Sequence, residues 1–336
     1  MKPQLVFRLA EKRDKPALLS FMDENWGEKH PLLHDEKFFH FYYETGPGLN
    51  FALAETPDGD IKAAAGFIPC NQAGGDIWIS LWCSKKEKGA QGAGLQLMGR
   101  MPQLTGANVV SCNNIRPETI PFYEFLGYTA GRIGHYYRMN PTLGAENVRL
   151  AVSPRPPLPT GGGAVLIPCA TEAQLSAFAI PQTLRPHKDL GYLRRRYFHY
   201  PYENGYQLYF GQKTAGGGPI FLLVVQKVPV PEAQSCVLRV VDYLGAPEDF
   251  TLLGQAFDLL MLNAGAEYLD CYAYGMPEDV MARAGLSARL PGDGAVIPNY
   301  LSPPLQENTE YYCFTSQAQN FLLFKADGDQ NRPSLL

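Results

Sequence analysis

The sequence contains no apolar run long enough to cross a bilayer. Its most apolar stretch, residues 220–225, has the length of a strand, whereas a membrane-spanning helix needs about 20 residues. The first residues, MKPQLVFRLAEKRDKP, interrupt a short apolar patch with Arg8 and further charges, which a secretory signal would not do. We therefore expect a cytoplasmic protein without a membrane partner.

The sequence also lacks a basic excess and a cysteine motif. Lys and Arg total 29 against 33 Asp and Glu, a net charge of −4, which disfavours nucleic acid as a partner. The cysteines are odd in number and form no CxxC pair, so we expect neither a disulfide framework nor a metal site. The seven are Cys70, Cys83, Cys112, Cys169, Cys236, Cys271 and Cys313.

Two domains are expected from a chain of 336 residues that is 46% hydrophobic. The stretch AVSPRPPLPTGGG has the composition of a semi-rigid linker. It predicts a first domain at 1–149, a linker at 150–163 and a second domain at 164–336. Both halves show strands and helices in a similar order, which indicates a diverged duplication.

The expected elements follow from periodicity and from turn and capping residues. In the first half the predicted strands are 4–9, 50–55, 61–69, 76–83, 109–112, a short one near 128, and 134–139. The predicted helices are 14–25, 35–43, one through 95–101 that Pro102 kinks or ends, and 117–126. In the second half the predicted strands are 165–168, 206–211, 220–225, 237–244 and 266–273, and the predicted helices are 171–178, 188–197, 249–263 and 277–284.

One glycine-rich loop separates a strand from a helix within residues 76–100, DIWISLWCSKKEKGAQGAGLQLMGR. Backbone N–H groups at a helix N-terminus suit a pyrophosphate, as do the neighbouring Lys85, Lys86 and Lys88. A Walker loop is excluded because Leu95 follows Gly94, and the dinucleotide fingerprint requires a parallel unit that the preceding hairpins do not form. A structural turn is the alternative interpretation of the loop.

This loop, followed by a helix, a strand and the segment FYEFLGY at 122–128, resembles the core of the GNAT acyl-CoA N-acyltransferase superfamily. The resemblance implies an α+β fold with two GNAT-like domains, each a mostly antiparallel twisted sheet flanked by helices, the second copy degenerate. It implies acetyl-CoA as acyl donor. Gly89 stands where the family usually has Arg or Gln. The implied donor-binding residues are Leu81, Cys83, Lys88, Gly89, Ala90, Gln91, Gly92, Ala93, Gly94 and Asn114.

The resemblance also implies a reaction in which an amine attacks the thioester directly. A backbone N–H within 81–83 would bind the oxyanion, and Tyr123 would protonate the CoA thiolate. The central strand carries no carboxylate after Asp76, so the usual general base is missing from its place. His30 and His135 are candidates for acceptor binding or proton removal, against a structural role for each.

Other residues are candidates for the acceptor pocket. The candidates are Trp26, Trp82, Asn113 and Arg195. The alternative explanation is core packing for the two tryptophans and loop capping for the asparagine. For Arg195, within Arg194–Arg196, it is a solvated helix face.

We therefore expect an N-acetyltransferase that acts, as a monomer or homodimer, on the amine of a small molecule. The segments 297–303 and 325–333 resemble tandem GNAT-like proteins of bacterial surface polysaccharide synthesis, which suggests a nucleotide-linked amino sugar. A non-catalytic CoA-binding or scaffold module is one alternative. Aminoacyl transfer from tRNA is another, which the acidic net charge disfavours.

Overall fold

The computed structural model describes residues 4–26, 30–73, 75–87 and 90–329. The chain divides into two compact units, and each takes segments from distant parts of the sequence. Unit 1 comprises 1–131, 185–201 and 313–319, and unit 2 comprises 132–184, 202–312 and 320–336. No helix in the described ranges is long and apolar enough to span a membrane.

Unit 1 is built on a seven-stranded sheet in the order β1-β2-β3-β4-β5-β14-β6. Neighbouring strands from β1 to β4 pair antiparallel, as do β5 and β14, whereas β4 and β5 are parallel. The strands are β1 (Val6–Leu9), β2 (Phe51–Glu55), β3 (Ile61–Pro69), β4 (Asp76–Ser84), β5 (Val109–Asn113), β6 (Thr129–Arg132) and β14 (Tyr312–Thr315).

The helices of unit 1 are η1 (Lys12–Asp14), α1 (Lys15–Trp26), α2 (Pro31–His34), α3 (Glu36–Tyr43), α4 (Ala93–Thr105), η2 (Pro117–Thr119), α5 (Ile120–Phe125) and α6 (Leu190–Tyr197). The longer helices bury apolar side chains, whereas the short helices η1 and η2 bury none. Helix α4 continues through Pro102 to Thr105, beyond the expected break. Burial of Leu97, Met98 and Met101 on one face stabilises it across the proline.

Unit 2 contains a second sheet in the order β13-β7-β12-β11-β10-β9-β8, with β15 paired to β12. The strands are β7 (Gly134–Met139), β8 (Val165–Pro168), β9 (Tyr206–Gln212), β10 (Phe221–Val230), β11 (Ser235–Leu244), β12 (Tyr268–Tyr274), β13 (Ser287–Ala288) and β15 (Leu323–Phe324). The helices are η3 (Ala145–Asn147), η4 (Glu172–Ala177), η5 (Pro231–Ala233), η6 (Pro247–Leu253), α7 (Gly254–Ala264), α8 (Glu278–Arg283) and η7 (Asp327–Asp329). The predicted α+β class with two mostly antiparallel sheets is confirmed.

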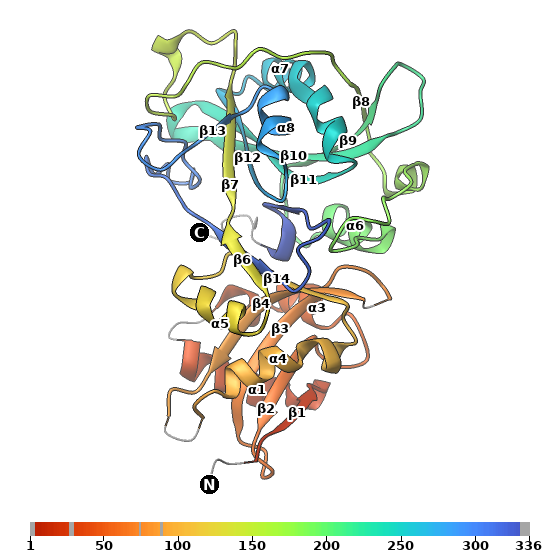
Figure 1. The fold of residues 1–336 in the computed structure, drawn as a ribbon, viewed down its shortest axis with the longest axis vertical. Helices are drawn as coiled ribbons and strands as arrows, with labels where there is room; N and C mark the ends of the chain where they lie inside the picture. Colours follow the sequence, from red (N-terminus) through yellow and green to blue (C-terminus); the bar gives the residue numbers. More distant parts are fainter. Residues whose placement is uncertain (1–3, 27–29, 74, 88–89, 330–336) are drawn as a thin grey trace. The chain divides into compact units, whose positions relative to one another are not determined.

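The two sheets have the same strand order, but each obtains one strand from the other half of the sequence. In Figure 1, β7 lies beside β12 and β13 of the second sheet, and its ladder with β12 pairs 134–139 with 268–273. Conversely, β14 lies between β5 and β6 of the first sheet. The observed units therefore differ from the expected ranges 1–149 and 164–336, because residues 132–149 pack with unit 2, and residues 185–201 and 313–319 pack with unit 1.

The start of the expected linker is packed within unit 2. Leu150 is buried, its N–H donates to Glu267, and Val152 forms a bridge with Val296. These contacts exclude a free linker at that point, since buried main-chain groups with partners are fixed in place.

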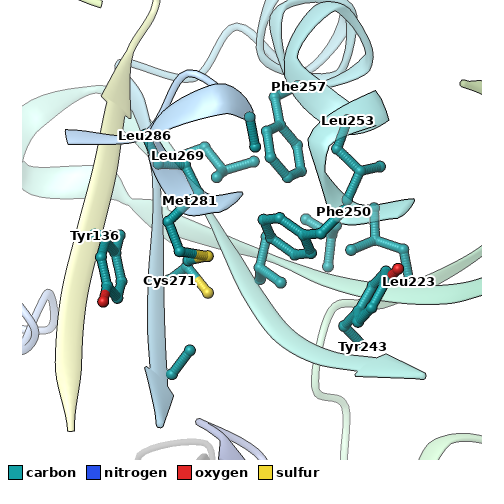
Figure 2. Close-up of a cluster of buried hydrophobic side chains, with 14 of the residues drawn as sticks. Tyr136, Leu223, Tyr243, Phe250, Leu253, Phe257, Leu269, Cys271, Met281 and Leu286 are labelled. Carbon is teal, nitrogen blue, oxygen red and sulfur yellow. The ribbon is translucent and has the colours of Figure 1, made fainter. Parts of the chain in front are cut away.

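The core of unit 2 lies between its sheet and the segment η6–α7. Figure 2 shows Phe250, Leu253 and Phe257 from this segment facing Leu223 and Leu269 of the sheet. All five side chains are buried, which anchors η6 and α7 on the face of β10–β12.

Candidate active site in unit 1

The parallel ladder between β4 and β5 is short. It covers three residue pairs and ends at Trp78 and Ser111, whereas both strands continue past that point. The register of β3 against β4 also shifts there, with Gly66 opposite Leu81 and Phe67 opposite Ile79, so Ser80 is the extra residue of a β-bulge. We call the place where this ladder ends the β4–β5 wedge.

Helix α4 begins shortly after β4 and directs its N-terminus to the loop that the sequence singled out. Gly92 is the N-cap with a φ of 81°, a left-handed conformation that glycine adopts without a Cβ penalty. Ala90 and Ala93 are buried, while Gln91 and Gly92 are exposed. A helix of 13 residues presents unsatisfied N–H groups and a partial positive charge at this end, which favours an anion.

The lysines near this loop are largely paired with carboxylates. Lys85 Nζ lies 2.6 Å from Asp60, and Lys62 contacts both Asp60 and Glu87. Lys86 is exposed. The predicted donor residues Lys88 and Gly89 lie outside the described residues.

An aromatic row runs from β4 across α5 to β14. The ring of Tyr123 lies 5.9 Å from that of Trp82 and stacks on Phe314 at 4.0 Å and 26°. Tyr123 is buried, and this burial raises the pKa of its hydroxyl well above the ordinary value of 10. The phenol therefore stays protonated at neutral pH, as a proton donor must.

Trp82 and Gly94 meet where β4 and α4 adjoin. A Cβ on Gly94 would lie 3.1 Å from Trp82 Nε1 and 3.2 Å from Ser84 Cβ. The glycine thus permits the close approach of the helix to the strand. Trp82 Nε1 is buried and finds no hydrogen-bond partner among the described residues.

The remaining predicted donor residues, and Asn113 of the predicted acceptor pocket, lie near the ends of the two central strands. Leu81 and Cys83 follow the bulge on β4, and burial raises the pKa of the Cys83 thiol. Asn113 ends β5 opposite Cys313. The exposed Asn114 follows with a φ of 63°, a left-handed conformation that asparagine tolerates in loops.

Two predicted acceptor residues lie together at the end of α1. The rings of Trp26 and His30 form an edge contact at 5.5 Å. His30 also caps α2, because its Nδ1 accepts from the N–H of Leu32 at 3.3 Å. His30 therefore has a structural role, whichever ligand role it adds.

Arg195 occupies a different part of unit 1 from the glycine loop. Its guanidinium donates to the carbonyls of Phe41 and Pro69 at 3.0 and 3.3 Å, and burial lowers its pKa. Pro69 is opposite Ile77, near the start of β4. Ile77 lies seven positions before Ser84, where β4 ends next to the glycine loop, and seven residues of a strand span about 20 Å. These contacts indicate that Arg195 fastens α6 to α3 and β3.

His135 belongs to unit 2, where it lies on β7 in a buried polar cluster. Its ring stacks on Tyr272 at 3.9 Å, its Nε2 lies 3.2 Å from Asp270, and Arg289 donates to its Nδ1. Burial lowers the pKa of His135, with partial opposition from Asp270. A stacked ring on one face and a partner for each ring nitrogen indicate a structural role.

Sequence reasoning missed two residues of the candidate site, Phe314 and Ser80. Phe314 lies far from Tyr123 in the sequence, and nothing in its local pattern assigns it to unit 1. Ser80 lies within an apolar strand, and its bulge is visible only in the register with β3. For Ser80, the sequence offered one signal: it lies on the strand that leads into the glycine-rich loop.

Solved structures share this fold. A GCN5-related N-acetyltransferase from Anabaena variabilis ATCC 29413 matches with a TM-score of 0.54 and 11% identity, over 93% of this chain and 72% of that chain. One from Kribbella flavida matches with a TM-score of 0.53 and 12% identity, over 94% and 71%. A conserved protein of unknown function from Enterococcus faecalis V583 gives 0.52 and 11%, over 93% and 72%.

No protein-family model and no curated protein matches the sequence. At identities of 11–12% the structural likeness establishes the fold alone. The chain therefore has the fold of the GCN5-related N-acetyltransferases over most of its length, which confirms the architecture that the sequence resemblance implied.

Proposed function

We propose that the chain is an acyl-CoA-dependent N-acyltransferase, with acetyl-CoA as donor, and that the β4–β5 wedge of unit 1 is its donor site. The observation that carries this proposal is the placement of three features in one unit. They are the end of the parallel ladder at Trp78, the N-terminus of α4 at Gly92, and the buried hydroxyl of Tyr123.

The donor would bind with its pyrophosphate at the start of α4. The left-handed Gly92 leaves the main chain open to an anion, and the helix contributes its N-terminal partial charge. The pairs Lys85–Asp60 and Lys62–Asp60 offset positive charge nearby, so the main chain would supply most of the binding. The thioester would then extend towards the bulge on β4.

The transfer would proceed directly within a ternary complex. The neutral amine attacks the thioester carbonyl, and a backbone N–H within 81–83 stabilises the oxyanion. The carbonyl re-forms as the carbon–sulfur bond breaks, and Tyr123 donates its proton to the departing thiolate. The attacking nitrogen gives up its proton to solvent and Tyr123 recovers a proton from solvent, which leaves the amide and the free CoA thiol as products.

The acceptor would be a small molecule carrying an amine, in the cytoplasm. The edge-packed pair of Trp26 and His30 at the end of α1 offers an aromatic surface and an imidazole for such a ligand. An amino sugar, including one linked to a nucleotide, is the first class of amine to test.

Calorimetric titration of acetyl-CoA into the full chain tests the donor site. Gly92→Glu places a carboxylate at the start of α4 and should abolish binding. Gly106→Glu is the matched control, because Gly106 caps the other end of the same helix with a φ of 70°, and a Cβ added there would meet no atom within 4 Å. Absence of binding to the wild type, or equal binding by both variants, would reject this donor site.

A further inference from the structure

Unit 2 repeats the geometry of the wedge. Strands β11 and β12 are parallel over three residue pairs, 238–240 with 269–271, and both then continue. The register of β10 against β11 shifts beyond this ladder, with Val224 opposite Asp242 and Val225 opposite Val240, so Val241 is the extra residue of a bulge. We call this place the β11–β12 wedge. It is the counterpart of the β4–β5 wedge, where Ser80 is the bulged residue.

A late segment of the chain, residues 321–326, is hydrogen-bonded to both strands of the β11–β12 wedge. On one side β15 pairs with β12, Phe324 opposite Ala273 and Leu323 opposite Tyr274. On the other side the N–H of Ala326 donates 2.9 Å to the carbonyl of Val241, the bulged residue of β11. We call residues 321–326 the strap.

The strap is buried, and its side chains are apolar except for that of Lys325. Phe321, Leu322, Leu323, Phe324, Lys325 and Ala326 all have 7% or less of their surface exposed. Phe324 and Leu322 belong to the main core of unit 2. The strap is as little exposed as a core strand and contributes to the same hydrophobic core, so it is part of the folded unit.

Two further features accommodate the strap in this place. A Cβ on Gly275 would lie 2.0 Å from the carbonyl oxygen of Phe321, and Gly275 has a φ of 86°, so only glycine admits the strap here. The Nζ of Lys325 lies 3.5 Å over the ring of Tyr311, and burial lowers the pKa of this amine well below its ordinary value.

We infer that the β11–β12 wedge is a binding site for an extended segment, and that the strap occupies it as an intramolecular ligand. Of these two wedges, the one in unit 1 is then left for acyl-CoA, because the equivalent position of unit 2 is filled by its own main chain. The statement about acyl-CoA rests on the proposed function. The occupancy of the β11–β12 wedge by the strap does not.

Hydrogen exchange of the full chain, read by mass spectrometry without added ligand, tests the occupancy. Peptides covering the strap should exchange as slowly as those covering β12, because both share one ladder. Exchange of the strap at the rate of an exposed loop would overturn the inference.

A pair of glycine variants sharpens this test. Gly275→Ala should accelerate exchange of the strap at least tenfold, because its Cβ meets the Phe321 carbonyl. Gly265→Ala is matched, with a φ of 67° and no atom within 4 Å of an added Cβ, and should leave the strap protected. Equal exchange in both would overturn the inference. Should Gly275→Ala fail to fold, Ala326→Pro, which removes the N–H donated to Val241, replaces it.

Acetyl-CoA at 1 mM, on the order of a thousand times a micromolar Kd, separates the two proposals. Unchanged protection of the strap, with at most one acetyl-CoA bound per chain and none to Gly92→Glu, supports the inference. Binding to Gly92→Glu together with deprotection of the strap would overturn it. No binding to the wild type, with the strap still protected, would reject the proposed function and support the occupied wedge.

Discussion

Phe314 stacks on Tyr123 with their ring centroids 4.0 Å apart, so a residue from the end of the sequence fixes the orientation of the candidate acid in unit 1. The same ring of Phe314 stacks on Tyr128 at 5.5 Å and 20°. Strand β14 carries Phe314 to this position by pairing with β5, where Phe314 is opposite Cys112. The candidate donor site therefore depends on residues 313–319, which lie in the sequence between two segments of unit 2.

Phe314→Leu should lower the free energy of unfolding by about 1–2 kcal/mol, because it removes two aromatic stacking contacts from a fully buried position. Urea denaturation measures this change. Phe125→Leu is the control, since Phe125 lies on α5 two positions after Tyr123 and has 78% of its surface exposed. It should change stability by less than about 0.5 kcal/mol. Equal effects of both variants would contradict the packing described for Phe314.

Tyr123→Phe should reduce kcat by about 10²–10⁴-fold and leave the Kd of acetyl-CoA within twofold, because it removes the proton donor and keeps the stacked ring. Steady-state kinetics and calorimetry measure the two quantities. Burial raises the pKa of Tyr123 above 10, so deprotonation of this residue should not reduce the wild-type rate below pH 10. A wild-type kcat retained by the variant would remove Tyr123 from the mechanism.

Stability should fall in acid through the buried cluster of unit 2. Burial lowers the pKa of His135 below its ordinary value, so the unfolded chain takes up its proton first and stability is lost as the pH falls below about 6.5. For Asp270, burial raises the pKa, but the charges and hydrogen bonds of Arg239 and His135 together outweigh it and hold the pKa at about 2, against about 3.9 in the unfolded chain. Its contribution is present above about pH 4 and is lost towards pH 2.

Urea midpoints measured from pH 7 to pH 2 check both windows. Asp270→Asn should destabilise the chain by about 3–5 kcal/mol at pH 7, because it leaves the Arg239 guanidinium buried without its carboxylate. The variant should also lose the acid dependence below pH 4. Retention of that dependence would assign it to other carboxylates.

Arg195→Met should lower the free energy of unfolding by about 1–3 kcal/mol, because the carbonyls of Phe41 and Pro69 lose their donors. The Kd of acetyl-CoA and the KM of the acceptor should stay within twofold. Arg194→Met, the neighbour on α6, is the control for the loss of one positive charge. A selective rise in the acceptor KM for Arg195→Met would restore the acceptor-pocket role predicted from the sequence.

The pattern of the sequence was sufficient for most of the local structure. Periodicity and turn residues predicted strands at 50–55 and 61–69, where β2 and β3 lie, and the predicted glycine-rich loop does precede α4. These features are local, since side-chain periodicity and turn residues act within a few positions along the chain. The repeated order of elements in the two halves likewise agrees with the identical strand order of the two sheets.

The sequence by itself determined the element types, the two-sheet α+β class and the loop that starts α4. Only the tertiary structure decided which strands complete each sheet, because ladders between β12 and β7 or between β5 and β14 join segments with no local signal of one another. It likewise decided that Phe314 lies on Tyr123, that Arg195 and His135 are held by internal partners, and that residues 321–326 fill the β11–β12 wedge. The physical reason is that main-chain hydrogen bonds and burial depend on which groups are close in space. Separation along the sequence affects only the entropic cost of closing the loop between them.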